Sequence, residues 1–250
     1  DGHIPYCFAP DVDDTVKNVF RMAVTVIMDN LRGCLNFEEV ATVFGTSLSK
    51  ERWEDGFDSA LEAECAETPA VFVQSNPAYG CFSVLGMIPD WKSQALQLNH
   101  PGCTHMGVTI HEIGHALGMH HEHQRPDRDK SIIVYWDNVR DDALDWFKLE
   151  PNVYSDQPYD ILSVMHYASH AFGKNDELPT ITTVDGSTAN LGGRGTLAES
   201  DVEQLVEMYK PVNAACKANA RTGIGCENMM GVACDGLTQC SAAARMDCCA

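Results

Sequence analysis

The sequence predicts an α+β fold followed by a small cysteine-rich tail. Segments with strand-like alternation and segments with apolar residues at helical spacing both occur up to about residue 210. A hydrophobic content of 44% over 250 residues suits one large domain with an appendage. From Cys216 to Cys249 the chain carries six cysteines and few core-forming residues, which is typical of a disulfide-stapled segment. We therefore predict one domain over residues 1–215 and a separate tail over residues 216–250.

The first half of the chain alternates between strand and helix patterns. A helix is expected to start at the carboxylates of residues 11–14, to run with apolar residues at helical spacing to about Leu31, and to end at Gly33. Residues 46–67 are largely polar but carry Trp53, Phe57 and Leu61 at helical spacing, which suggests a helical insertion. Short strands are expected at residues 4–8, 35–43, 70–73, 81–85 and 94–99.

The second half is predicted to be less regular. A helix should begin near Thr104, and a short one should cover residues 141–147 after an apolar segment at 132–139. Residues 148–196 show little periodicity, whereas 197–209 form an amphipathic helix that Pro211 closes.

The charge balance excludes two classes of partner. The chain has 17 basic and 36 acidic residues, which gives a net charge of −19. Nucleic acids and anionic membranes are bound by clustered Lys and Arg, so neither is an expected partner. No apolar run is long enough to span a bilayer, and we expect no membrane insertion.

The eleven cysteines indicate an oxidising compartment and hence a secreted, extracellular protein. Reduced zinc–thiolate sites are the competing explanation, but the C-x₂-C pairs that such sites usually contain are absent. Disulfide bonds are therefore expected. Because eleven is odd, at least one thiol is free or paired outside this chain.

Residues 111–121 contain the pattern H-E-x-x-H-x-x-G-x-x-H, a zinc-hydrolase motif. On a helix, His111 and His115 lie four residues apart on one face, so both imidazoles can reach one metal ion. Gly118 can adopt the left-handed conformation that ends a helix, and the chain then turns back to bring in His121. Three protein ligands leave an open position, as in catalytic zinc sites. Zn²⁺ is the predicted cofactor.

The same helix has an apolar face opposite the two histidines. Met106, Ile110, Ile113 and Leu117 follow helical spacing and are predicted to be buried. A glycine inside a helix costs about 1 kcal/mol relative to alanine. We therefore expect another element to pass close to Gly114.

Glu112 is predicted to be the catalytic general base. It is rotated by one residue from His111, so it can contact a metal-bound water without binding the metal. His120 and His123 stand close enough in sequence to compete for the metal, but the motif spacing favours His121. A His-rich helix end with no metal is the alternative, and the complete motif disfavours it.

Two further blocks extend this motif. Residues 122–129 read E-H-Q-R-P-D-R-D, and residues 158–167 read P-Y-D-I-L-S-V-M-H-Y. Over about residues 4–210 the sequence resembles the astacin family of metzincin zinc endopeptidases. The resemblance implies a metzincin/zincin-like, two-lobed catalytic domain with a twisted five-stranded mixed sheet and an active-site helix.

The resemblance also assigns individual roles. Met165 would lie in a turn beneath the zinc, and Tyr167 would bind the metal through its hydroxyl and assist in stabilising the oxyanion. Glu122 would meet the mature N-terminus in a buried ion pair. Apart from the resemblance, His166 is expected to be a hydrogen-bonded group rather than a ligand, and Asp127, Arg128 and Asp129 to form a salt-linked turn. The implied partners are protein or peptide substrates and a propeptide outside this chain.

Two disulfide bonds are implied by the resemblance, and a third is suggested as a remaining pair. If all three form, the tail keeps five cysteines; if the tail pairs only within itself, five remain in the larger domain. The implied pairs are Cys81–Cys103 and Cys34–Cys216, and the suggested pair is Cys7–Cys65.

The leading hypothesis is a secreted zinc endopeptidase. The alternative is a binding or toxin-like protein in which the cysteine-rich tail acts and the protease fold is an inactive scaffold. The intact general base, Glu112, argues against the alternative, because a scaffold need not retain one.

Overall fold

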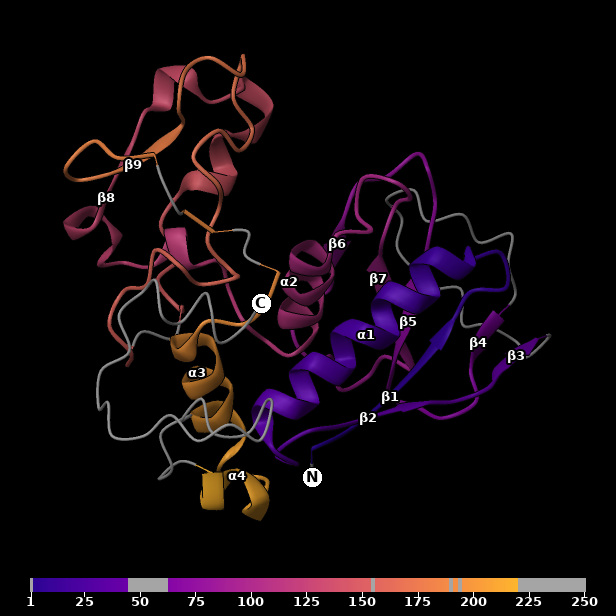
Figure 1. Cartoon of the computed structure of the whole chain (residues 1–250). Coiled ribbons are helices and arrows are strands. Elements are labelled where there is room, and N and C mark those ends of the chain that lie inside the picture. The colour runs from indigo at the N-terminus through magenta and orange to yellow at the C-terminus, as the bar shows by residue number, and fades with distance from the viewer. Residues whose placement is uncertain (1, 45–62, 154–155, 189–190, 193–194, 220–250) are drawn as a thin grey trace, which may run out of the picture.

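A five-stranded sheet forms the centre of the N-terminal lobe (Figure 1). We describe the fold from a computed structural model, which covers residues 2–44, 63–153, 156–188, 191–192 and 195–219. The strand order is β2-β1-β5-β7-β6, and every neighbouring pair is parallel except β6 and β7, which are antiparallel. The predicted mixed sheet is therefore confirmed. Its strands are β1 (His3–Phe8), β2 (Asn36–Glu39), β5 (Ala70–Gln74), β6 (Phe82–Ser83) and β7 (Ser93–Gln97).

The predicted strand at 35–43 and insertion at 46–67 differ from the structure. β2 ends at Glu39, and the chain leaves the sheet to form β3 (Thr42–Phe44), which pairs with β4 (Ala63–Cys65) in an antiparallel ribbon. The helical interpretation is wrong for residues 63–65, because all three are buried in this ribbon and Cys65 is bonded to Cys7. Residues 66 and 67 are not helical either, and the rest of the predicted insertion, residues 46–62, lies outside the described part of the chain.

Four α-helices are present among the described residues: α1 (Asp14–Leu31), α2 (Met106–Ala116), α3 (Glu199–Tyr209) and α4 (Ala214–Asn219). α1 starts as predicted, because the Asp13 carboxylate accepts a hydrogen bond from the Thr15 N–H at 2.6 Å. It ends at Arg32, which adopts a left-handed conformation just before Gly33. Its buried face includes Phe20 and Ile27, as the apolar spacing predicted.

The C-terminal lobe has little regular structure. The short helix predicted at 141–147 is a 3₁₀ segment, and one two-stranded antiparallel sheet stands on the far side of this lobe (Figure 1). Its elements are η1 (Glu122–Gln124), η2 (Arg128–Lys130), β8 (Ile132–Val134), η3 (Trp136–Asn138), η4 (Asp141–Phe147) and β9 (Ile181–Thr183).

Two separate apolar cores correspond to the two lobes. The larger joins the sheet, α1, α2 and α3, and it also includes Val164 and Met165 from the C-terminal lobe. The smaller core contains six buried residues of the C-terminal lobe: Ile132, Val139, Ala143, Phe147, Ile181 and Leu191. The turn that carries Met165 therefore packs into the N-terminal lobe and ties the two halves together.

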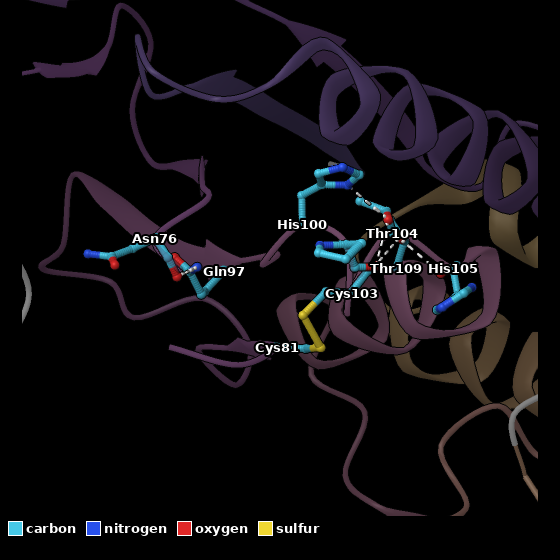
Figure 2. The surroundings of a disulfide bond; sticks show 9 residues. Asn76, Cys81, Gln97, His100, Cys103, Thr104, His105 and Thr109 are labelled. Carbon is cyan, nitrogen blue, oxygen red and sulfur yellow. Dashed lines mark hydrogen bonds between the residues drawn. A yellow bond between two sulfur atoms is a disulfide. The ribbon is translucent and has the colours of Figure 1, made fainter. Parts of the chain in front are cut away.

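All three expected disulfides are present. Cys81–Cys103 fastens β6 to the segment that leads into α2 (Figure 2). Cys34–Cys216 closes a separation of 182 residues, which in the chain-entropy account stabilises the fold by roughly 5 kcal/mol. This bond joins the first cysteine of the predicted tail to the N-terminal lobe. Residues 220–250, with the other five cysteines, lie outside the described part, so the tail remains a prediction.

Candidate metal centre and active-site cleft

Three imidazoles converge at the end of α2. His111 and His115 share one face of the helix, which ends at Leu117. Gly118 has a φ of 94°, the left-handed conformation that its place in the motif predicted, and the chain turns back to His121. The Nε2 atoms of the three rings lie 3.1–3.2 Å from one another. The predicted triad is therefore assembled at one point.

The outer nitrogen of each ring determines where its proton lies. His111 Nδ1 is 2.8 Å from the Val164 carbonyl and His115 Nδ1 is 2.8 Å from the Met119 carbonyl. A carbonyl only accepts, so both rings carry the proton on Nδ1 and present a bare Nε2 lone pair inward. Burial lowers the pKa of all three histidines, which favours the neutral form.

Unprotonated nitrogens at this separation repel one another unless a cation lies between them. A tetrahedral ion with Zn–N bonds of about 2.0–2.1 Å would place its nitrogen ligands about 3.3–3.4 Å apart, close to the spacing seen here. Among the described residues, this triad is the only group of three or more His, Cys, Asp or Glu side chains arranged to hold a metal. The donor set therefore fits zinc.

Glu112 lies beside the triad without hydrogen-bonding to it. The residue is buried, and its Oε2 atom has no hydrogen-bond partner. Burial raises the pKa of Glu112 to about 8, while a bound cation would favour the charged form. An unpartnered carboxylate oxygen next to a metal position can bind and deprotonate a water molecule there.

The triad and Glu112 form the floor of a cleft of about 860 Å³. One wall comes from β6 and the Cys81 disulfide, and the other from Trp146, Tyr167 and Phe172 of the C-terminal lobe. A cleft of this size accommodates several residues of an extended peptide. It lies between the two lobes, as a catalytic cleft served by both would require.

Tyr167 stands at the edge of the metal position. Its ring stacks on His123, with centroids 3.9 Å apart, and lies 4.6 Å from the His121 ring. Burial, together with the Glu112 carboxylate, raises the pKa of Tyr167, so its hydroxyl stays protonated at neutral pH. The hydroxyl is therefore a hydrogen-bond donor. Its predicted bond to the metal remains a prediction.

Comparison with known proteins identifies the family. The sequence model of the peptidase family described as "Astacin" matches residues 59–210, more than half of the chain. The chain belongs to the astacin family. This is a family of zinc metalloendopeptidases, so zinc is the metal that the three histidines are suited to bind.

Individual relatives in the astacin family agree with this assignment. The low choriolytic enzyme of Oryzias latipes is 34% identical over 139 residues, which cover 56% of this chain and 50% of that protein. The zinc metalloproteinase dpy-31 of Caenorhabditis elegans is 40% identical over 134 residues, 52% of this chain and 22% of that protein. The chain thus spans half or less of these relatives' length.

A solved structure confirms the astacin fold. High choriolytic enzyme 1, a hatching enzyme zinc-protease from Oryzias latipes, superposes with a TM-score of 0.64 over 83% of this chain and 89% of that one, at 24% identity. No helix among the described residues is long and apolar enough to cross a membrane.

The turn that carries Met165 meets α2 at Gly114. A Cβ atom added to Gly114 would lie 2.6 Å from the Met165 sulfur, so a larger residue here would force the Met165 side chain to move. The close passage expected at Gly114 is confirmed, and the passing element is the turn that also supports His111 through the Val164 carbonyl. Met165 is buried against this glycine, which lies between His111 and His115 on the helix.

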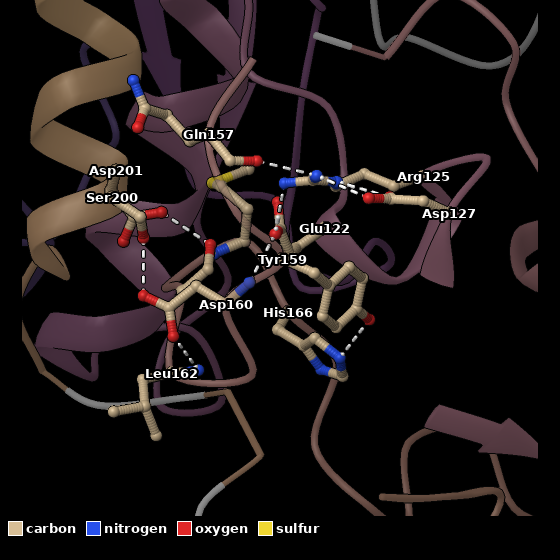
Figure 3. A network of polar contacts seen from close by, with 12 residues as sticks. Glu122, Arg125, Asp127, Gln157, Tyr159, Asp160, Leu162, His166, Ser200 and Asp201 are labelled. Atoms are coloured by element: carbon tan, nitrogen blue, oxygen red, sulfur yellow. Dashed lines mark hydrogen bonds and ion pairs between the residues drawn. The ribbon is translucent and has the colours of Figure 1, made fainter. Parts of the chain in front are cut away.

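A network of polar contacts joins the segment after the triad to residues 157–166 of the C-terminal lobe (Figure 3). The Glu122 carboxylate accepts hydrogen bonds at 2.9 Å from Arg125 and from the Asp160 N–H. Its contact with a mature N-terminus, which the resemblance implied, remains a prediction. Arg125 also donates to Asp127, and Arg128 donates to Asp129 at 2.9 Å, so the salt-linked turn predicted at residues 127–129 is confirmed. Burial raises the pKa of Glu122 to about 7 although Arg125 opposes the shift.

The remaining histidines of the motif region have other roles. His166 Nε2 is 2.7 Å from the Tyr159 hydroxyl and its Nδ1 is 2.7 Å from a backbone carbonyl, so its predicted hydrogen-bonded role is confirmed. His123 Nε2 donates to the Trp146 carbonyl and is turned away from the triad. His120 lines the cleft but is not part of the triad.

Sequence reasoning did not identify the groups that support the ligands. Asp201 on α3 accepts hydrogen bonds from the Ser163 hydroxyl at 2.6 Å and the Val164 N–H at 2.9 Å, which fixes the turn behind His111. Gln124 Oε1 lies 2.9 Å from His121 Nδ1. A backbone carbonyl leaves no trace in sequence, whereas a polar residue three positions after a ligand is a signal that could have been examined.

Proposed function

We propose that this chain is a secreted zinc-dependent endopeptidase that hydrolyses protein and peptide substrates. The observation that supports this most directly is the meeting of three imidazole Nε2 atoms and the unpartnered Glu112 oxygen in the lining of an open cleft. Metal affinity is assigned to His111, His115 and His121, with Tyr167 as an additional ligand. Catalysis is assigned to Glu112 and Tyr167.

Bound zinc would supply a Lewis acid that polarises the peptide carbonyl and acidifies water. Glu112 then accepts the proton of the attacking water and delivers it to the leaving amine. The Tyr167 hydroxyl, kept protonated by its raised pKa, donates a hydrogen bond to the oxyanion that develops on the carbonyl oxygen.

Secretion is supported by the three disulfide bonds, because such bonds persist in oxidising compartments. A propeptide outside this chain is a further proposed partner. The alternative function in the cysteine-rich tail concerns residues outside the described part, and no observation favours it.

Cleavage of casein or gelatin tests the proposal. We expect cleavage that a chelator blocks and added zinc restores. The variant Glu112→Ala should bind one zinc per chain but lose about 10²–10⁴-fold in kcat/KM. Full activity of Glu112→Ala in a zinc-loaded sample, or a wild-type protein that binds no zinc, would overturn the proposal.

A further inference from the structure

The three ligand histidines are supported in two different ways. Backbone carbonyls hold the outer nitrogens of His111 and His115, as described above. His121 instead faces a side-chain amide, that of Gln124, at 2.9 Å. Among these three supports, only the one at His121 can be removed by replacing a side chain.

The orientation of the Gln124 amide is fixed by its second contact. Its Nε2 lies 3.4 Å from the Lys148 carbonyl oxygen, and because a carbonyl only accepts, this contact favours the orientation with the NH₂ group on that side. The amide oxygen therefore faces His121. An oxygen there accepts, so it requires the proton on His121 Nδ1 and leaves Nε2 bare.

The backbone of Gln124 holds the amide in place. The Gln124 N–H donates to the His121 carbonyl at 3.2 Å, and the Gln124 carbonyl accepts from the Glu150 N–H at 2.8 Å. These bonds tie the residue to the ligand on one side and to the segment after η4 on the other. The side chain therefore needs little reorganisation to keep its contact with the imidazole.

Resting on the proposed zinc site, we propose that Gln124 is a positioning residue that sets the tautomer and ring orientation of His121 and thereby the affinity for zinc. The other neighbours of His121 do not perform this task. Tyr167 and His123 contact it through their ring faces and edges, with centroids at 4.6 and 5.1 Å, and such contacts do not select a tautomer. A free neutral imidazole carries its proton on either nitrogen.

Two substitutions of Gln124 distinguish the effect of its hydrogen-bond acceptor from the effect of its side-chain size. Gln124→Leu keeps a similar side-chain size but cannot accept from Nδ1. Gln124→Glu keeps an acceptor, and a carboxylate in this place increases the basicity of a ligating imidazole. Gln157, which lies in the same lobe with its amide directed away from the Glu122–Arg125 pair, offers matched controls (Figure 3).

Zinc affinity measured by competition with a chromogenic chelator tests the assignment. Gln124→Leu should weaken zinc binding by about 10-fold, at the low end of the usual effect of such supports. Gln124→Glu should bind at least as tightly as wild type, while Gln157→Leu and Gln157→Glu should match it. Equal affinity of Gln124→Leu and wild type would overturn the inference.

A second measurement does not depend on zinc or activity. In the metal-free protein, long-range ¹H–¹⁵N NMR spectra distinguish the two neutral tautomers of each histidine. We expect the Nδ1–H form of His121 in wild type and Gln124→Glu, and a mixture in Gln124→Leu. A wild-type His121 protonated on Nε2 would contradict the inference. Wild-type protein that shows the Nδ1–H form but binds no zinc would instead refute the proposed function.

Discussion

The two lobes of this astacin-family chain are stabilised in different ways. The N-terminal lobe is built from a sheet and helices whose buried faces repeat at regular spacing, with Phe20, Ile27 and Leu96 fully buried in one apolar core. The C-terminal lobe has a core of six residues and depends on buried polar groups such as Arg125 and Arg128. Both lobes contribute to one site, but apolar packing specifies the first and hydrogen bonds specify much of the second.

The largest expected effect tests the polar side of this comparison. Arg125 and Glu122 form an ion pair in which both side chains are almost fully buried, at 3% and 7% exposure. Arg125→Met leaves the Glu122 carboxylate buried without its cation, which should lower the free energy of unfolding by about 3–5 kcal/mol. Chemical denaturation measures this loss.

The matched control for Arg125 lies in the same lobe. Arg140 pairs with Asp142 at 3.2 Å, but both side chains are exposed. Arg140→Met should therefore cost less than about 1 kcal/mol. Similar losses in the two variants would show that the buried network does not stabilise the C-terminal lobe.

The next prediction concerns Tyr167, the catalytic group proposed for the C-terminal lobe. Tyr167→Phe removes only the hydroxyl and keeps the ring stacked on His123. We expect kcat to fall by about 10²-fold, the scale of losing one oxyanion donor, with a small change in KM. Steady-state kinetics on a peptide substrate separates the two constants.

Tyr209→Phe serves as the control for a lost phenol. Its hydroxyl donates to the Leu117 carbonyl at 3.1 Å and takes no part in the cleft. This variant should lose about 1 kcal/mol of stability and keep its kcat. If Tyr167→Phe behaves in the same way, Tyr167 is a packing residue.

The contrast between the lobes also explains what sequence could predict. The apolar spacing of α1 and the carboxylates before it predicted its limits within a few residues, and the motif predicted the three histidines that converge. A histidine pair on one helix face is a local property, so its sequence spacing determines its geometry. The interpretation of residues 63–65 as helix failed because pairing with β3, a tertiary contact, overrode local spacing.

The residues that hydrogen-bond to the three histidines, or that hold the groups which do so, could not be predicted from sequence for a related reason. Asp201 accepts a hydrogen bond from the Val164 N–H, 37 positions away in the sequence. The Val164 carbonyl contacts His111 Nδ1, 53 positions away. Such contacts depend on how an irregular chain closes on itself, and they follow no period. Gln124 is the local exception, three positions from His121.

The smallest predicted effect lies where the two lobes touch, at Gly114 and Met165. Gly114→Ala gains about 1 kcal/mol in helix propensity. The added Cβ atom would lie 2.6 Å from the buried Met165 sulfur, which must therefore move. Overpacking of this kind costs about 1–3 kcal/mol. We expect a net loss of about 1 kcal/mol in the free energy of unfolding.

With Met165→Ala already present, the obstacle is gone and the same substitution should stabilise the protein. Denaturation of the single and double variants gives the coupling energy. An equal effect of Gly114→Ala in both backgrounds would show that α2 and the turn beneath it are not in tight contact.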